Sequence, residues 1–242
     1  MIDLCYRLNF PARQMDISTF SKVSKQRSQR PFLEIYENLI EQVNRQKPTD
    51  EFGFVPIDAT IIILTSKLLC NQGFNEVKLI SGLDLGSEGT TDNIVTFGKK
   101  HDINFGPELV ASLPAKAVAI MEREFASLEF MAQMDRENKY FILRINQNYT
   151  LSFIEGSELF KVGTGEEAGE YRVVNFCSLE SRKEYRLVSN LPLSGEEALT
   201  QTEIAEAYRK RWSIEIFWKF LKMHLKLDEL ITKNVNGIGI QI

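Results

Sequence analysis

Two acidic residues lie where an acidic side chain is costly unless it has a partner. Asp58 interrupts the apolar segment from Phe52 to Leu64, whose β-branched and aromatic residues are typical of a buried strand. Glu122 directly follows a second apolar segment, 117–121, and open α/β sheets place their sites at the carboxyl ends of strands. A buried carboxylate needs a cation, hydrogen bonds or a metal ion. Each residue is therefore a candidate for metal-assisted chemistry. The alternative for each is a polar strand end that hydrogen-bonds a turn.

A third group of reactive side chains follows one edge of a helix that we predict from a capping box at Thr200 to about Leu227. At about 100° per residue, four of its polar side chains project within roughly 60° of one another. They are Tyr208, Arg211, Glu215 and Lys222. A stripe of this kind can be a ladder of surface ion pairs. It also combines a metal-capable carboxylate with phosphate-binding groups, as phosphodiester chemistry requires.

The spacing of these four residues resembles a known signature. Tyr208-x₂-Arg211-x₃-Glu215-x₆-Lys222 is similar to the tyrosine–arginine–glutamate–lysine motif of the insertion-sequence family four transposases. Upstream, Ile57-Asp58-Ala59-Thr60 resembles the segment that carries the first catalytic aspartate of that family. The segment 121–127, Met-Glu-Arg-Glu-Phe-Ala-Ser, resembles the segment that carries the second. The similarity covers most of the chain from about Asp16 onward.

The resemblance implies a DNA transposase with a ribonuclease-H-like catalytic domain. Asp58, Glu122 and Glu215 would then be the catalytic residues and the metal-binding carboxylates. The expected cofactor is Mg²⁺ or Mn²⁺, with two ions roughly 4 Å apart that activate a water or a 3′-hydroxyl and stabilise the leaving oxygen. No residue of the chain acts as a nucleophile in such a mechanism.

The same resemblance assigns DNA-binding roles to the rest of the stripe. Tyr208, Arg211 and Lys222 would contact phosphates, and we expect Arg211 and Lys222 to share an exposed face with Glu215. The expected partner is double-stranded DNA, at transposon ends and at the target, where strands are cleaved and transferred. A homodimer in a synaptic complex fits this scheme. The location would be the bacterial cytoplasm, at the nucleoid when the protein is bound to DNA.

Two substitutions depart from the family pattern. Glu122 stands where aspartate is usual, and the extra methylene moves the carboxylate by about 1.5 Å. Glu124 stands where glycine is usual, which adds bulk and negative charge. A nearby Asp135-Arg136 pair imitates the motif but falls in a predicted helix. We also expect a truncated copy that lacks part of the N-terminal region and the helices after Ile242. These features predict impaired activity.

The elements that position these residues alternate along the chain. We expect a mixed α/β sheet with flanking helices, in two parts: residues 1–47 as a partial N-terminal helical DNA-binding region, and 48–242 as the catalytic domain. Further strands are predicted at 77–83, 93–97, 117–121 and 140–145, and helices at 107–113 and 126–134. The glycine-punctuated stretch 146–192 is either a β-rich insertion before the last catalytic helix or the far edge of the sheet; the family resemblance implies the insertion.

Composition excludes several classes of protein. The chain has 242 residues, 43% hydrophobic and 26% charged, with no apolar run long enough to span a membrane. Its three cysteines are far apart, which argues against a disulfide framework and for a reducing cytoplasm. Although the net charge is −4, basic residues concentrate in 1–30 and 208–226, which is compatible with local phosphate binding and equally with solvated helix faces.

Three functions remain compatible with the sequence. The first is a DNA transposase. The second is a non-catalytic DNA-binding remnant of one, and the third is a general metal-dependent nuclease of the same fold. Metal-dependent strand cleavage separates the second from the others, and joining of a transposon end to target DNA separates the first from the third.

Overall fold

The computed structural model describes residues 16–45, 53–64, 73–86, 89–91, 93–113, 116–177, 182–230, 232 and 234–242. Most of the predicted strand at Phe52–Leu64 lies in these ranges, but Phe52 itself does not. Residues 1–15 and 46–47 of the predicted N-terminal region also lie outside them. Within the described ranges, no helix is long and apolar enough to cross a membrane.

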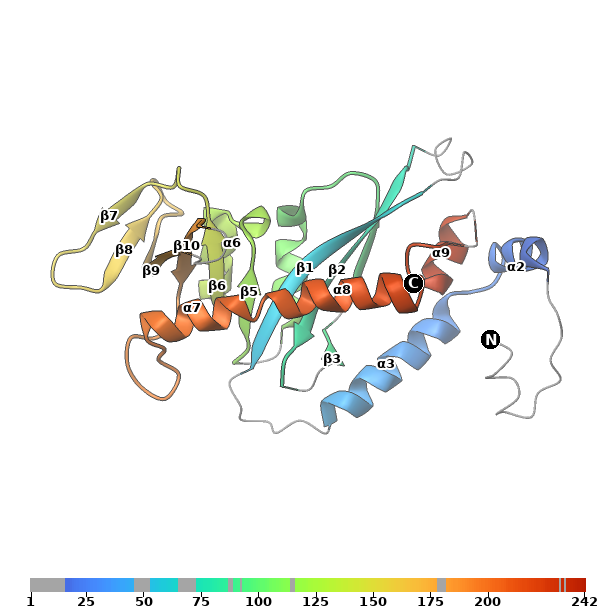
Figure 1. Ribbon diagram of the computed structural model, residues 1–242, viewed down its shortest axis with the longest axis horizontal. Coiled ribbons are helices and arrows are strands. Elements are labelled where there is room, and N and C mark those ends of the chain that lie inside the picture. Colours follow the sequence, from blue (N-terminus) through green and yellow to red (C-terminus); the bar gives the residue numbers. More distant parts are fainter. Residues whose placement is uncertain are drawn as a thin grey trace.

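One continuous mixed sheet forms the centre of the molecule (Figure 1). The strand order is β3-β2-β1-β5-β6-β10-β9-β8-β7, and β4 also pairs with β2. The strands are β1 (Phe54–Ile63), β2 (Glu76–Asp84), β3 (Gly89–Thr90), β4 (Ile94–Phe97), β5 (Val118–Met121), β6 (Tyr140–Ile145), β7 (Leu151–Phe153), β8 (Leu159–Val162), β9 (Gly169–Cys177) and β10 (Glu184–Ser189). β1 is antiparallel to β2 and parallel to β5, which is parallel to β6. This is the mixed α/β sheet with flanking helices expected of a ribonuclease-H-like fold.

Helices cover both faces of this sheet. They are α2 (Ile17–Ser24), α3 (Arg30–Arg45), α5 (Gly106–Ser112), α6 (Leu128–Arg136), α7 (Gln201–Arg209), α8 (Trp212–His224) and α9 (Val235–Gln241), with short 3₁₀ turns η1 (Asp102–Phe105) and η2 (Arg123–Phe125). In Figure 1, α7 and α8 cross in front of the central strands, and α3 lies beside α8. Thr200 and Glu203 form the predicted capping box at the start of α7.

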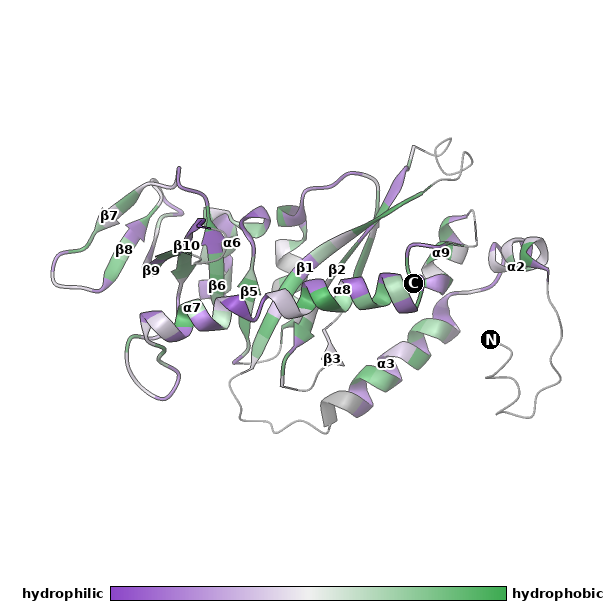
Figure 2. Cartoon of the chain, in the orientation of Figure 1, coloured by the Kyte–Doolittle hydropathy of each residue, from purple (hydrophilic) through white to green (hydrophobic). Residues whose placement is uncertain are grey.

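Alternation along the strands decides which side chains meet which helices, because successive residues of a strand point to opposite faces. Odd-numbered residues of β1, β5 and β6, such as Ile57 and Leu143, join the core under α5 and α6. Even-numbered residues point to the other face, where Ile120 and Ile142 pack against α7. Figure 2 shows β1 rich in hydrophobic residues, whereas hydrophobic and hydrophilic residues alternate along α7 and α8.

The prediction of a strand buried on both faces is wrong for the second half of β1. Ile61 is 44% exposed and Ile63 is 74% exposed. The pairing with β5 extends only from Phe54 to Pro56, so β1 continues past its parallel neighbour. The even-numbered face of this extension stays covered, since Ile62 packs against Ile214 and Trp218 of α8.

The predicted single helix from Thr200 to about Leu227 is two helices. α7 ends at Arg209 and α8 begins at Trp212, with Lys210 and Arg211 between them. The amide of Arg211 donates to the carbonyl of Tyr208 (3.0 Å) and the amide of Ser213 to that of Lys210 (2.9 Å). These are i→i−3 hydrogen bonds, so a tight 3₁₀-type turn replaces one α-helical turn at the junction.

The stretch 146–192 contains β7, β8, β9 and β10. Because β10 pairs with β6 along Arg186–Ser189, these strands extend the central sheet as its far edge. They precede α7 in the chain. The stretch is β-rich, and its strands form the far edge of the sheet. That it is an inserted unit stays a prediction, and so does the domain boundary at residue 47.

Candidate active site

Three neighbouring parallel strands each place a charged residue at the same level. The register pairs Pro56 of β1 with Ile120 of β5, and Ile120 with Ile142 of β6. Two residues further along are Asp58 in β1, Glu122 directly after the end of β5, and Arg144 in β6. By strand alternation they share the face toward α7 and α8. The sequence analysis selected the two carboxylates and missed Arg144. The sequence does single out Arg144, because it is the one charged residue in the apolar strand Tyr-Phe-Ile-Leu-Arg-Ile.

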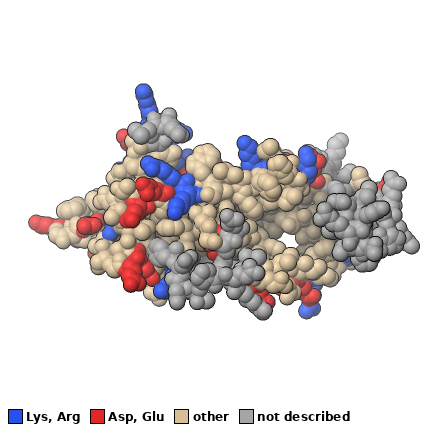
Figure 3. Space-filling view, turned by 60° about the horizontal axis from the view of Figure 1, so that its bottom comes forward, with Lys and Arg blue, Asp and Glu red and all other residues tan. Residues whose placement is uncertain are grey.

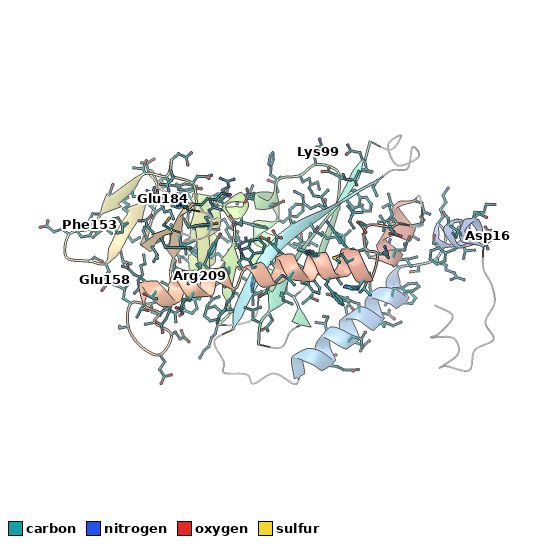
Figure 4. The ribbon with its side chains drawn as sticks, viewed as in Figure 1. Asp16, Lys99, Phe153, Glu158, Glu184 and Arg209 are labelled. Atoms are coloured by element: carbon teal, nitrogen blue, oxygen red, sulfur yellow. The ribbon has the colours of Figure 1, made fainter. Side chains whose placement is uncertain are left out.

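The junction between α7 and α8 brings three more side chains onto this group. The hydroxyl of Tyr208 donates to Glu122 Oε1 at 2.6 Å. Arg211 Nη2 donates to Glu215 Oε1 at 2.6 Å and lies 3.3 Å from Glu122 Oε1. The helix stripe and the strand carboxylates, far apart in sequence, therefore meet on one face of the sheet. Figure 4 labels Arg209, the last residue of α7, beside the junction from which Arg211 enters the group.

Glu122 is the most fully bonded carboxylate of the group. In addition to Tyr208 and Arg211, Arg144 Nη1 donates to Glu122 Oε2 at 3.1 Å, and the amide of Arg123 also donates to Oε2, at 3.3 Å. Burial by itself would raise the pKa of Glu122. The Tyr208 hydrogen bond and the two guanidinium groups outweigh burial and lower that pKa. Glu122 is therefore an ionised group held by donors from α7, the α7–α8 junction, β6 and η2.

Asp58 is in the opposite situation. Burial raises the pKa of its carboxyl from 3.8 to about 6, with Glu215 and Asp102 adding to the rise and Arg211 opposing it. Among the residues that the structure describes, no cation forms an ion pair with Asp58. A half-buried carboxylate without a counter-ion is destabilised in its ionised form, and a cation from outside the chain would stabilise it.

The expected exposure of Arg211 is wrong. Arg211 is 7% exposed, and Tyr208 is 4% exposed. The physical reason is that Ile214 and Trp218 follow Arg211 at positions i+3 and i+7, so all three lie on the face of the helix that packs on the sheet. There the paired carboxylates Glu122 and Glu215 hold the guanidinium, and their attraction keeps the pKa of Arg211 raised in spite of burial.

Burial also raises the pKa of Tyr208, and the adjacent negative charge of Glu122 adds to the effect. Its ring packs 6.2 Å from that of Phe176 and 6.0 Å from that of Tyr185. The phenol is therefore a neutral hydrogen-bond donor whose orientation is set by aromatic neighbours on β9 and β10.

Lys222 lies two turns further along α8 than Glu215. Its ammonium donates to the main-chain carbonyl of Ile61 at 3.3 Å, which places it beside the extension of β1. Lys222 therefore lies apart from the carboxylates at the other end of the stripe. On the face drawn in Figure 3, the basic and acidic side chains of the described residues are interspersed and form no continuous basic surface.

The donor chemistry of the site suits a divalent ion only in part. Asp58 and Glu215 fit, because both are hard oxygen ligands and Asp58 lacks a counter-ion. Glu122 does not fit in this arrangement, since both of its oxygens already accept hydrogen bonds. Accordingly, no set of three acidic, histidine or cysteine residues within the described part of the chain is arranged to hold a metal ion.

Known proteins provide a comparison for this geometry. The sequence family described as transposase DDE domain matches residues 52–242. A proposed transposase for the insertion sequence element IS4SA from Synechocystis sp. is 43% identical over 241 residues, which are 98% of this chain and 70% of that protein. A transposase proposed for the element IS5377 from Geobacillus stearothermophilus is 24% identical over 166 residues, which are 62% of this chain and 42% of that protein.

Among solved structures, the endonuclease V of Bacillus subtilis is similar over 86% of this chain and 99% of its own. The sequence identity is 12% and the TM-score is 0.30. A likeness this weak supports no conclusion about this chain.

Proposed function

We propose, since this chain belongs to the DDE transposase family, that it cuts DNA at the ends of an insertion sequence and joins the cut ends to a target. Double-stranded DNA is the proposed substrate, and a homodimer in a synaptic complex is the proposed working state. Residues 1–47 would contribute to DNA binding and 48–242 would carry the chemistry. The proposed location is the bacterial cytoplasm.

The observation that carries this proposal is the meeting of Asp58, Glu122 and Glu215 on one face of the sheet. Asp58 lies in β1, Glu122 directly follows β5 and Glu215 lies in α8. Arg211 contacts both Glu122 and Glu215, and the charges of Arg211 and Glu215 both act on Asp58. A surface ladder along one helix, the alternative from the sequence, would not bring the stripe against strand carboxylates. The convergence supports a catalytic role for the three acids.

Transposases with a DDE domain generally use divalent metal ions. We propose Mg²⁺ or Mn²⁺, two ions, with Asp58, which lacks a counter-ion, and Glu215, which is paired with Arg211, among the ligands. When bound, such ions supply an activated oxygen nucleophile and stabilise the leaving oxygen. The chain's own part is positioning: Lys222 and the guanidinium of Arg211 neutralise and orient phosphate oxygens, and the neutral phenol of Tyr208 donates a hydrogen bond.

One observation favours the second candidate function, DNA binding without cleavage. Glu122 stands where the family usually has aspartate, and here Tyr208, Arg211 and Arg144 surround it. A carboxylate that is permanently held in this way would leave the site without its third metal ligand. The test of function must therefore measure cleavage and binding separately.

The experiment uses labelled duplexes that carry the terminal inverted repeats flanking the gene, with Mg²⁺ or Mn²⁺. Metal-dependent cleavage, followed by joining to a target plasmid, supports the transposase; cleavage without joining supports a nuclease, and binding without either supports the remnant. Asp58→Asn and Glu215→Gln should abolish cleavage and leave folding intact. Asp135→Asn is the matched control, because Asp135 belongs to the look-alike Asp-Arg pair in α6 and hydrogen-bonds Asn190 instead. Equal cleavage by Asp58→Asn and the wild type would refute the assignment.

A further inference from the structure

Arg211 is the cation that joins two of the three acids. A single nitrogen, Nη2, lies 2.6 Å from Glu215 Oε1 and 3.3 Å from Glu122 Oε1. The arginine side chain is 8% exposed, so this charge is largely withdrawn from water. A guanidinium in this place offsets the mutual repulsion of two carboxylates, as a bound metal ion would.

The same side chain also carries a donor that the chain does not satisfy. Arg211 Nε is buried and makes no hydrogen bond with any residue that the structure describes. A buried donor without an acceptor is destabilising, and native structures rarely keep one without a reason. The Nε and Nη2 edge of arginine is a fork that matches two oxygens of a phosphate. The carboxylates therefore satisfy Nη2 of Arg211 and leave Nε without an acceptor among the described residues.

Arg144 holds Glu122 from the opposite side. Its guanidinium lies 3.1 Å from Glu122 Oε2 and stacks over the ring of Tyr185, with 4.4 Å between the guanidinium carbon and the ring centre. This contact does not depend on α7 or α8. Arg144 would therefore keep Glu122 in place if Arg211 moved away.

From these contacts we infer that Arg211 is the resident cation of the DNA-free site, and that phosphate and metal bind cooperatively by displacing it from Glu122 and Glu215. A DNA phosphate satisfies Nε and draws the guanidinium off the two acids. Glu215 is then free to join Asp58 as a ligand, and Glu122, which keeps its hydrogen bonds from Tyr208 and Arg144, offers the side of Oε1 that Arg211 leaves. A divalent ion that arrives first meets the positive guanidinium and binds weakly. This inference rests on the proposed function, because it assumes that DNA phosphate and metal share the site.

The test measures Mn²⁺ affinity on the full, DNA-free chain, by calorimetry and by electron paramagnetic resonance of free Mn²⁺. Arg211→Gln should bind Mn²⁺ about tenfold more tightly than the wild type, which corresponds to about 1.4 kcal/mol. In the wild-type background Glu122→Gln should change the affinity less than about threefold, whereas in the Arg211→Gln background it should weaken binding about tenfold. The difference between these two effects on Mn²⁺ affinity measures the coupling between Arg211 and Glu122. Such coupling is expected if Arg211 occupies a carboxylate that would otherwise bind the ion. Lys219→Gln is the matched control, because Lys219 is an exposed base on the same helix, and it should leave the Mn²⁺ affinity unchanged.

Circular dichroism and thermal melts establish that each variant is folded. Arg211→Lys serves as the second variant, because an ammonium reaches one acid and leaves the other free, and its Mn²⁺ affinity should be intermediate. If Arg211→Gln and wild type bind Mn²⁺ equally, or if Glu122→Gln abolishes binding in the wild-type background, the inference is overturned while the cleavage assay is unaffected. Absence of Mn²⁺ binding in every variant would overturn the inference and the proposed metal site together.

Discussion

Asp58 should destabilise the metal-free chain at neutral pH, and Asp58→Asn should therefore stabilise it. The pKa of Asp58 is raised from 3.8 to about 6, chiefly by burial. Since one pKa unit corresponds to about 1.36 kcal/mol, ionised Asp58 opposes folding by at most about 3 kcal/mol. Partial exposure of the side chain screens this effect, and we expect about 2 kcal/mol. The amide of asparagine keeps an oxygen that can accept the hydrogen bond from Ala59, so the substitution removes the charge and little else.

The dependence on pH has a definite direction. Because the folded chain holds the Asp58 proton more tightly than the unfolded chain, folding is favoured at low pH, and this advantage is lost as the pH rises from about 3.8 through about 6. Asp58→Asn has no such proton. Its gain over the wild type should be greatest above pH 6 and should shrink toward zero near pH 4.

The assay is urea unfolding of both proteins between pH 4 and pH 8 with a chelator present, followed by titration with Mn²⁺ at pH 7.5. Mn²⁺ should stabilise the wild type and have little effect on Asp58→Asn. A variant that is less stable than the wild type at pH 7.5, or a stability difference that does not change with pH, would refute the reasoning. Either result would mean that Asp58 has a favourable partner inside the fold.

Three further substitutions test the packing and charges around the site. Tyr208→Phe removes the 2.6 Å hydrogen bond to ionised Glu122 and should lower the free energy of unfolding by about 1.5–3 kcal/mol, measured by chemical denaturation. Lys222→Ala should reduce the slope of log affinity against log salt for duplex DNA by about one phosphate contact, with unfolding stability nearly unchanged. Gly82→Ala should destabilise the chain by about 1–3 kcal/mol, because a Cβ there would lie 2.7 Å from Val55 Cγ1 and 2.8 Å from Thr91 Oγ1 in the middle of the sheet.

Much of the secondary structure follows from local pattern. Tyr140–Ile145 is the strand that its apolar run predicts, and the capping box at Thr200 and Glu203 starts α7 as expected. Both signals depend on neighbours within a few residues, which the sequence displays directly. The break at Lys210–Arg211 had no such signal, because neither glycine nor proline marks it. The 3₁₀ turn occurs where the helix face that carries Ile214 and Trp218 packs on the sheet. A tertiary contact of this kind cannot be read from neighbouring residues in the sequence.

The types and spacing of the site residues were also readable from the sequence. Asp58 stood out as a charge inside an apolar strand, and Tyr208, Arg211 and Glu215 as a stripe on one helix. Arg144 had the same kind of signal as Asp58, because it is the one charged residue of an apolar strand, but an arginine there did not match a catalytic motif.

Only the tertiary structure decided what these groups do to one another. The exposure of Arg211, the missing counter-ion of Asp58 and the crowding of Glu122 all depend on which strands are neighbours and on how α8 crosses them. Burial and charge pairing act through space, and the hydrogen bond from Tyr208 to Glu122 joins residues 86 positions apart in the chain. Short-range periodicity determined the elements and the chemistry they carry, whereas desolvation and long-range pairing determined that the site of the DNA-free chain is held by its own arginine.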